Sequence, residues 1–520
     1  MPNLAPRHDV AAPVVALAAR SVRVNNPRIR SKTLCWQIVM ITIPLLLGSV
    51  RAGLLLFHDP LLAYANSYDQ TRYTACFDLY PERAVDIAPT QNSPAAPFSH
   101  YVFIGTNDPL CYWSSDLIFQ ATSVAIYRLV ELGEGHVAHS VWVIGVLRLL
   151  ALLVVCMLLS RAWLRRDQPW LAIVNAALLP LLFADPANTL YLNTFYAEWT
   201  ALLALYACIS LILLNCESRC SSKRFCWLLL TALLLATSKI QHIFLPLALT
   251  VVAMVAGRLR GMRWWRWQSV ALLLGACAGL YFQFVQLQRD GEMMQTIRQY
   301  NSADVLLTAL LPASSDPVIA AAQLQIDPSC LQYIGKAAWQ LPDLPNRACP
   351  GLINFTRGRE LGMLAQQPLT FLRICWLGVQ NLSPWMADNI GHVEGAEFAK
   401  LPTAWFSMSR AFDASRVLLV GMFLLPSATL LLMLFYRRWR NHAQFLLFTA
   451  LIAVTQQTTL LITVLGDGLA DTAKQGGLAV NAGIAWLLVS AILLIARIAT
   501  QRTPTTPSIS INNSARQTSP

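Results

Sequence analysis

The fold is decided by residues 225–257, which read FCWLLLTALLLATSKIQHIFLPLALTVVAMVAG. At 33 residues, this block is long for one membrane-spanning helix and short for two. A single helix would place Lys239 and His242 near the middle of the membrane, where a charge costs at least a few kcal/mol. It would also put the basic residues on its two flanks on opposite sides of the membrane. We therefore predict two short helices that meet at Lys239–His242, with both basic flanks on one side.

The rest of the chain has the same apolar character. Of its 520 residues, 56% are hydrophobic and 13% are charged, and the mean hydropathy is +0.48. This charged fraction is about half that of a soluble globular protein. The composition predicts an all-α polytopic transmembrane helical bundle with two loop regions outside the cytoplasm. We expect about ten spans, at residues 34–57, 140–160, 170–183, 199–214, the two halves of 225–257, 270–285, 417–436, 445–465 and 478–495.

Basic residues are distributed unevenly along the chain. Of the 39 Lys and Arg residues, 22 fall in the two tails and in the short segments on one side of the predicted spans. Such a bias marks the cytoplasmic side, so we expect both termini in the cytoplasm. The formal net charge of +12 lies in short runs between apolar blocks. This placement favours membrane lipids as partners and argues against nucleic acid.

The predicted spans divide the chain into five parts. The last of them is rich in Ser, Thr, Pro and Asn, a composition typical of disordered segments. We expect a basic cytoplasmic tail (1–33), an N-terminal transmembrane module (34–285) with a first outer loop (58–137), an outer loop domain (286–415), C-terminal transmembrane helices (416–497) and a disordered cytoplasmic tail (498–520).

Four of the 12 cysteines lie in the predicted outer loops. Cys76 and Cys111 share the first loop, and Cys330 and Cys349 share the second. Two pairs in an oxidising compartment predict two disulfides, with free thiols as the alternative. We find no spacing of cysteine and histidine that predicts a metal site.

An acidic residue follows the first predicted span, in the stretch Asn66-Ser67-Tyr68-Asp69-Gln70-Thr71-Arg72. On a helix, Arg72 would share a face with Asp69. Near the membrane surface, Asp69 could act as a general base, and Arg72 could bind a phosphate or orient that base. The alternative is an exposed ion pair without a function.

A second acid, Glu198, lies at the outer mouth of the fourth span, in Phe195-Tyr196-Ala197-Glu198. It either faces a polar cavity or stabilises the N-terminus of the helix that follows. Lys239 and His242, at the predicted turn, suit the phosphate of a lipid headgroup. Alternatively, the lysine side chain reaches the interface without contacting a ligand.

These features together resemble the GT-C class of membrane glycosyltransferases, and in particular bacterial glycan-biosynthesis hexose transferases. The resemblance extends over most of residues 34–495. It rests on the stretch with Asp69, on Phe-Tyr-Ala-Glu at 195–198, on short central helices with an outward Lys239-x-Gln241, and on a helix ending in Gln-Gln-Pro at 366–368.

The resemblance implies a function as well as a fold. It implies an enzyme of the bacterial inner membrane that moves a sugar, with inversion, from a polyprenyl-phosphate donor to a glycan or lipid acceptor. Asp69 would be the base, Glu198 a second acid near the acceptor or a metal, and Lys239 the phosphate ligand, aided by Arg72. Many relatives have an adjacent acidic pair where this chain has Asp69 alone, so a divalent metal is left open as a cofactor.

Two other functions remain as alternatives. A transporter or flippase of lipid-linked glycans would need no catalytic acid, and its polar residues would be scattered along a pathway open to both faces. A glycan polymerase or ligase would have its chemistry in the later loops, around Arg357, Arg359 and His392. Convergence of Asp69, Glu198 and Lys239 on one cavity would favour the transferase.

Overall fold

The computed structural model describes residues 27–63, 67–82, 98–105, 111–216, 221–259, 265–384, 391–392, 406–436 and 442–502. Nearly all regular structure in these residues is helical, and the five strands have two to four residues each. The prediction of an all-α polytopic bundle is confirmed. Most of both predicted tails, including residues 1–26 and 503–520, lies outside the described residues.

Each predicted span coincides with a helix. Among the described residues, seven helices are long and apolar enough to cross a membrane, and residues 169–183 and 198–214 form shorter apolar helices. The bundle consists of α2 (Pro27–Leu56), α5 (Trp142–Leu164), α6 (Pro169–Leu178) continued by the π-helical turn η2 (Leu179–Phe183), α8 (Glu198–Leu214), α9 (Ser222–Ser238), α10 (Phe244–Leu259), α11 (Trp265–Arg289), α19 (Arg416–Phe435), α20 (Ala443–Gly466) and α22 (Gly477–Arg502).

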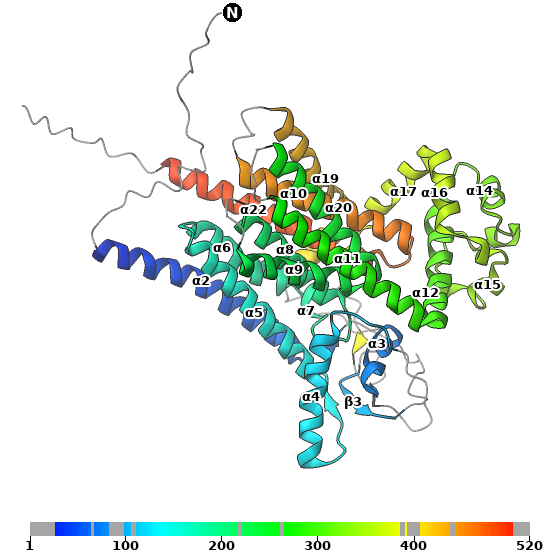
Figure 1. Cartoon of the computed structure of the whole chain (residues 1–520), viewed down its shortest axis with the longest axis horizontal. Coiled ribbons are helices and arrows are strands. Elements are labelled where there is room, and N and C mark those ends of the chain that lie inside the picture. The colour runs from blue at the N-terminus through cyan, green and yellow to red at the C-terminus, as the bar shows by residue number, and fades with distance from the viewer. Residues whose placement is uncertain are drawn as a thin grey trace, which may run out of the picture.

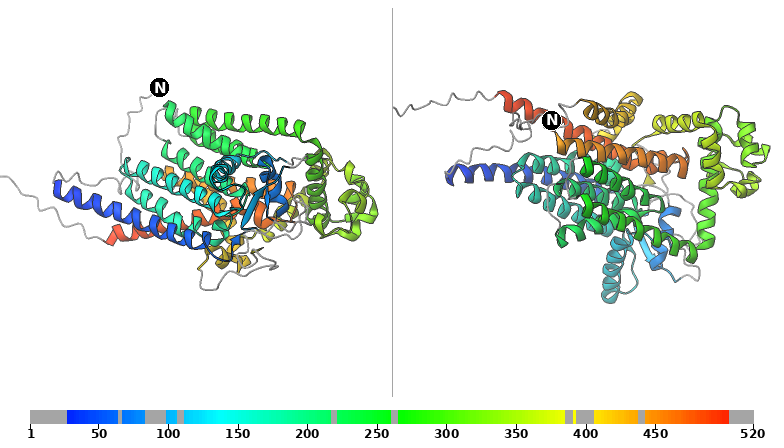
Figure 2. Two further views of the ribbon diagram at one scale, coloured as in Figure 1. Left: turned by 90° about the horizontal axis from the view of Figure 1, so that it is seen from below. Right: turned by 45° about the horizontal axis from the view of Figure 1, so that its top comes forward.

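The bundle has two distinct ends. The start of α2 and the end of α22 lie at the same end, which we call the terminal end (Figure 1). The segments between α2 and α5 and between α11 and α19 lie at the opposite end, which we call the loop end (Figures 1 and 2). That the terminal end faces the cytoplasm stays a prediction.

The predicted break at Lys239 is confirmed. Helix α9 ends just before this residue, whose backbone is extended, and the 3-10 turn η3 (Ile240–Ile243) leads into α10. A Cβ atom placed on Gly257 would lie 2.2 Å from the side chain of Trp265, so α10 ends where α11 begins. Because α10 and α11 share this end, they run in opposite directions.

Two glycines bring α11 against α9. A Cβ atom on Gly275 or on Gly279 would lie 2.7 Å from the Cβ atom of Ala232 or of Ala236, respectively. Residue numbers rise together along this contact, so α9 and α11 are parallel and α10 is antiparallel to both. The start of α9 and the end of α10 therefore share one end of the bundle, as predicted for their basic flanks. Small residues at such contacts allow helix backbones to approach closely within membranes.

The first loop-end segment surrounds a small sheet. It contains α3 (Ser67–Thr74), α4 (Leu117–Glu134) and three antiparallel strands in the order β2 (Leu79–Pro81), β3 (His100–Phe103), β4 (His139–Ser140). A disulfide joins Cys76 to Cys111, with an S–S distance of 2.11 Å. A second ladder pairs β1 (Leu62–Ala63) with β5 (Gly391–His392), from the second loop-end segment.

The second loop-end segment forms a helical lobe with its own apolar core. This lobe projects from the bundle beside the loop end (Figures 1 and 2). A disulfide joins Cys330 to Cys349 within it. Its core also includes Phe423 of α19 and Leu460 of α20, so the lobe packs on the bundle. Its main helices are α12 (Gly291–Asp304), α14 (Pro317–Leu324), α15 (Pro345–Ala348), α16 (Arg357–Gln366) and α17 (Pro368–Asn381).

The contact of Gly275 in α11 with α9 allows the helix arrangement to be tested. We expect Gly275→Leu to force α11 away from α9 and to destabilise the protein by about 1–3 kcal/mol, the usual cost of overpacking. The measurement is the thermal unfolding of detergent-purified protein. The control is Gly421→Leu in α19, because a Cβ atom there meets nothing within 4 Å. Equal melting temperatures for the two variants would contradict the close contact.

Candidate functional site

The site begins with Asp69, which α3 presents toward the bundle. Its Oδ1 atom lies 2.9 Å from Arg72 Nη2, one helical turn away. Its Oδ2 atom bonds to the Nζ atom of Lys474, which lies 405 residues later in the chain. Burial alone would raise the pKa of Asp69, but the adjacent Arg72 and Lys474 outweigh burial and hold this pKa below its ordinary value. Asp69 is thus a partly buried, ionised carboxylate, and not an exposed loop residue.

Glu198 and Lys239 form a second pair beside the first. Glu198 is the first residue of α8, and its carboxylate pairs with the ammonium group of Lys239. Side chains of both residues are largely buried, at 11% and 7% exposure. Oε2 of Glu198 has no hydrogen-bond partner among the described residues. Lys239 is therefore paired inside the protein, and Glu198 both begins α8 and forms this pair.

The short helix α21 (Thr472–Gln475) connects the two pairs. Its Lys474 holds Asp69, and its Gln475 accepts hydrogen bonds from Lys239 Nζ at 3.5 Å and from Gln241 Nε2 at 2.9 Å. Lys474 also lies over the ring of Tyr196, 4.6 Å from its centroid. Residues from four distant parts of the sequence therefore meet at one place.

A cavity of about 40 Å³ lies at this meeting point. Glu198, Lys239, His242 and Lys474 line it, whereas Asp69 reaches it through its contact with Lys474. Further lining comes from Asn188, Tyr191, Trp199, Pro384, Ser409, Gln475 and Asn481. His242 Nδ1 is 2.8 Å from Ser238 Oγ, a contact that fixes the imidazole ring at the cavity wall. The cavity combines cationic and anionic groups with polar and apolar side chains.

The cavity residues do not fit a divalent metal. Each of the two carboxylates, Asp69 and Glu198, is in contact with an ammonium group, which would repel a second cation. Within the described part of the chain, no three His, Cys, Asp or Glu side chains are grouped as metal ligands. Positive charge in this cavity comes instead from Lys239 and Lys474, and Arg72 adds a further positive charge beside Asp69.

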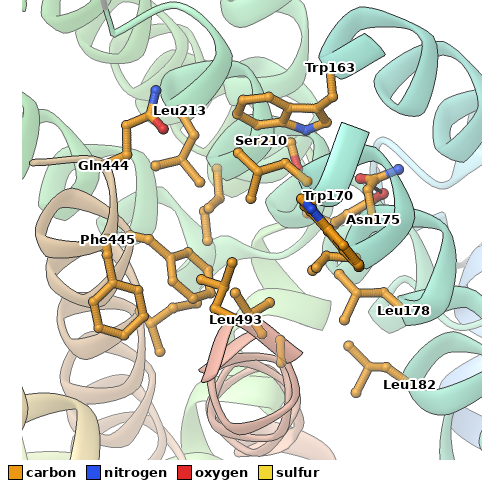
Figure 3. Close-up of a pocket in the computed structure, with 18 of the residues that line it drawn as sticks. Trp163, Trp170, Asn175, Leu178, Leu182, Ser210, Leu213, Gln444, Phe445 and Leu493 are labelled. Atoms are coloured by element: carbon orange, nitrogen blue, oxygen red, sulfur yellow. Dashed lines mark hydrogen bonds between the residues drawn. The ribbon is translucent and has the colours of Figure 1, made fainter. Parts of the chain in front are cut away.

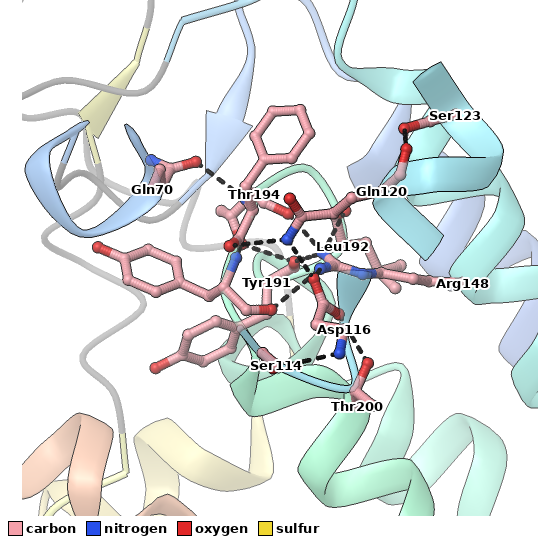
Figure 4. Close-up of polar contacts among 12 residues, drawn as sticks. Gln70, Ser114, Asp116, Gln120, Ser123, Arg148, Tyr191, Leu192, Thr194 and Thr200 are labelled. Atoms are coloured by element: carbon pink, nitrogen blue, oxygen red, sulfur yellow. Dashed lines mark hydrogen bonds and ion pairs between the residues drawn. The ribbon is translucent and has the colours of Figure 1, made fainter. Parts of the chain in front are cut away.

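A buried ion pair holds the segment of chain that leads to Glu198. Arg148 of α5 and Asp116, both wholly buried, lie 2.7 Å apart (Figure 4). Arg148 also donates hydrogen bonds to four backbone carbonyls in residues 191–196, the segment that precedes Glu198. Asp116 Oδ1 accepts a hydrogen bond from Thr200 of α8 at 2.6 Å. This network fixes the position from which α8 begins.

The same stretch of chain fixes the end of α9. Ser114 Oγ donates to the carbonyl of Ser238 at 2.7 Å, and the backbone N–H of Ser115 donates to that of Thr237 at 3.0 Å. Lys239 is the next residue. Residues 114–116 therefore hold both the Glu198 and the Lys239 positions.

Three further acids lie on the lobe side of the site. Burial raises the pKa of Asp304 to about 8, against the hydrogen bond that it accepts from the Ala338 N–H at 2.7 Å. Burial likewise raises the pKa of Asp471 to about 6, and Lys474 opposes this rise. The pKa of Asp467 is also raised by burial. These acids bear on one another and on Asp69 through their charges, so not all of them are ionised together at neutral pH.

Several residues of the site are not among those that the sequence predicts. Lys474 and Gln475 lie in a short loop before the last predicted span, and no local pattern connects them to Asp69. Arg148 could have been identified from the sequence, because it is a charged residue inside the second predicted span, where burying a charge costs free energy. Asp116 lies in the first loop without any comparable signal.

The two later-loop arginines lie apart from this cavity. Arg357 pairs with Glu360 at 2.7 Å, and Arg359 donates to the carbonyl of Asn354 at 2.9 Å. His392 belongs to the short strand β5. Neither arginine is among the residues that line the cavity.

Loss of the buried Arg148 should lower the stability of the folded protein strongly. We expect Arg148→Met to destabilise the protein by about 3–5 kcal/mol, because it leaves Asp116 and four carbonyls without their partner. Thermal unfolding in detergent measures the effect. Arg128→Met is the matched control, since the Arg128 side chain that pairs with Glu131 is half exposed, and its loss should change stability by at most about 1 kcal/mol. Equal effects of the two substitutions would contradict the supporting role of Arg148.

The raised pKa of Asp304 predicts that the stability of the protein depends on pH. The pKa of Asp304 is higher in the folded protein, at about 8, than in the unfolded chain, so its contribution to stability is lost as pH rises from about 4 to 8. Asp304→Asn removes this loss and keeps the acceptor for Ala338. Its gain in melting temperature over the natural protein should grow across that range and then level off. A gain that is independent of pH, or an equal gain from the exposed Asp343→Asn, would contradict the assignment.

Comparison with known proteins agrees with the membrane architecture. No curated protein matches the chain significantly. The family model described as the YfdI N-terminal transmembrane domain matches residues 31–346, which is more than half of the chain and includes Asp69, Glu198 and Lys239. The chain therefore belongs to the YfdI N-terminal transmembrane domain family, and it is a multi-pass integral membrane protein.

Proposed function

We propose that the chain is a membrane glycosyltransferase that moves a sugar from a polyprenyl-phosphate donor to a hydroxyl of a glycan or lipid acceptor. The observation that carries the proposal is the convergence of Asp69, Glu198, Lys239 and Lys474 at one buried cavity. Two ammonium groups beside two carboxylates suit a reaction in which a phosphate leaves and a hydroxyl loses its proton. The sequence resemblance to GT-C enzymes leads to the same proposal. We infer that the loop end faces away from the cytoplasm, in the inner membrane of a bacterium.

The phosphate of the donor would bind at Lys239 and Lys474. Both ammonium groups now neutralise carboxylates, and a phosphate would offer them more negative charge. Arg72, 2.9 Å from Asp69, would then remain as its main partner. Because Lys474 now helps to hold the pKa of Asp69 low, moving this lysine to the phosphate would raise that pKa. Donor binding thus makes Asp69 a stronger base.

The reaction then follows from the positions of the charges. The acceptor oxygen forms a bond to the anomeric carbon while the bond from that carbon to the phosphate oxygen breaks, which inverts the configuration. The bonding electron pair leaves with the phosphate, where the two lysines stabilise the developing charge. The hydroxyl proton passes to Asp69. Glu198 would orient the acceptor, since its Oε2 atom is available for a hydrogen bond.

Replacing the proposed base tests the function. Asp69→Asn should lower sugar transfer by about 10²–10⁴-fold, the usual contribution of a general base, while the protein remains in the membrane at its normal amount. The readout is mass spectrometry of surface glycans from cells that carry or lack the protein, combined with immunoblots of their membranes.

The exposed Asp78→Asn is the control, because it lies in the same loop-end segment and should leave transfer unchanged. Full transfer by the Asp69 variant would refute its role as the base. If surface glycans lost no sugar when the whole protein was absent, the transferase assignment would fail. If the sugar were lost without the protein but fully retained with Asp69→Asn, a flippase, which needs no proton acceptor, would be favoured.

A further inference from the structure

A second, larger cavity lies within the bundle. It has a volume of about 270 Å³ and lies among the end of α5 and the helices α6, α8, α20 and α22. In Figure 3, the side chains of Trp163, Leu213, Phe445 and Leu493 surround a common space. The function proposed above does not yet use this cavity.

The wall of the large cavity is chemically apolar. Leucine, isoleucine and aromatic side chains make up most of it, and some of its few polar groups already have hydrogen-bond partners. Asn175 Nδ2, for example, donates to Ser160 Oγ at 2.8 Å, and Asn175 Oδ1 accepts a hydrogen bond from the Tyr206 hydroxyl at 2.5 Å. A sugar or a phosphate would lose its hydration there and gain few partners. Hydrocarbon is the occupant that this wall fits.

The large cavity meets the polar one. Asn481 and Leu202 line both of them. At this junction the amides of Asn188 and Asn481 bond to each other in both directions, at 2.6 and 3.0 Å. On one side of the junction lie Lys239 and Lys474, and on the other the largely apolar wall continues. Together the two cavities match an amphiphile with a phosphate at one end.

The dimensions favour an extended chain. Along α22 the lining runs from Asn481 to Leu493, a rise of about 18 Å at 1.5 Å per residue. This is more than half of the roughly 30 Å thickness of a bilayer core. The cavity extends from the site toward the terminal end, where Trp163 and Trp170 line it.

We propose that the large cavity binds the polyprenyl chain of the lipid-linked donor, whose phosphate lies at Lys239 and Lys474. This inference rests on the proposed function for the identity of the lipid. It adds that the donor chain lies inside the bundle, between α8 and α22, and not along the lipid-facing surface. Chain length therefore contributes to recognition of the donor, because each isoprene unit buries further apolar area in the cavity.

Filling the cavity tests this proposal. Ala485→Phe places a ring in the lining of the cavity, whereas Ala491→Phe on the same helix is exposed and outside that lining. The probes are a long-chain polyprenyl phosphate and citronellyl phosphate, which has only two isoprene units. Binding of both is measured with the purified full chain by native mass spectrometry.

We expect the natural protein to bind the long-chain phosphate at least about tenfold more tightly than the short one. Ala485→Phe should lose this preference and keep its affinity for the short probe, which also shows that the variant is folded. Ala491→Phe should keep the preference. An undiminished preference in Ala485→Phe, or no preference in the natural protein, would overturn the proposal. Equal competition by phosphatidylglycerol vesicles would also overturn it, because the cavity would then be a general lipid site.

A photoreactive long-chain polyprenyl phosphate gives a second measurement that needs no variant. Labelling between Asn481 and Leu493 would support the cavity, and labelling confined to lipid-facing residues would refute it. These results are separable from the proposed function. Chain-dependent binding without any sugar transfer would preserve the cavity and refute the transferase. Normal transfer from a long-chain donor by Ala485→Phe would preserve the transferase and refute the cavity.

Discussion

The structure depends on how one irregular, buried segment satisfies its backbone. Residues 184–197 follow η2 inside the bundle without forming a long helix, and all of them are buried. Within a membrane, each backbone carbonyl without a partner costs several kcal/mol. Arg148 removes this cost for four carbonyls, because its planar guanidinium group has five N–H donors. Asp116 balances the positive charge that Arg148 brings into the interior.

The Arg148–Asp116 pair also determines where the site lies. A buried ion pair is a weak source of stability, since desolvation offsets most of its attraction. Here the ion pair serves to hold neighbouring segments in place. Asp116 binds Thr200 of α8, and the preceding serines bind the last turn of α9, so one anchored segment fixes the starting point of Glu198 and the end point before Lys239. The two side chains then meet without a direct connection in the sequence.

Sequence predicts those features whose physical cause is local. The break at Lys239 is predictable because a charge interrupts an apolar block, and the energetic cost of that charge is visible within the block itself. The spacing of Asp69 and Arg72 is predictable for a similar reason, since one helical turn brings them together. Lys474 differs, because its partner lies 405 residues away and only the folded bundle brings α21 to α3. The short strand pairs are equally non-local, since β1 pairs with a strand more than 300 residues later.

Charge balance explains how one site could hold a stable resting state and still carry out a reaction. Without substrate, Lys239 and Lys474 are each neutralised by a carboxylate, so the buried groups avoid the cost of an isolated charge. A phosphate that enters the cavity competes for the same lysines, and it leaves the carboxylates with fewer partners than before. The energy for this exchange must come from elsewhere in the ligand. An apolar chain buried in the adjacent cavity would supply it, because burial of hydrocarbon stabilises the complex without using any of the charged groups. Binding energy from a part of the substrate that does not react would thus be used to make Asp69 a base, which is how remote binding increases catalytic rate.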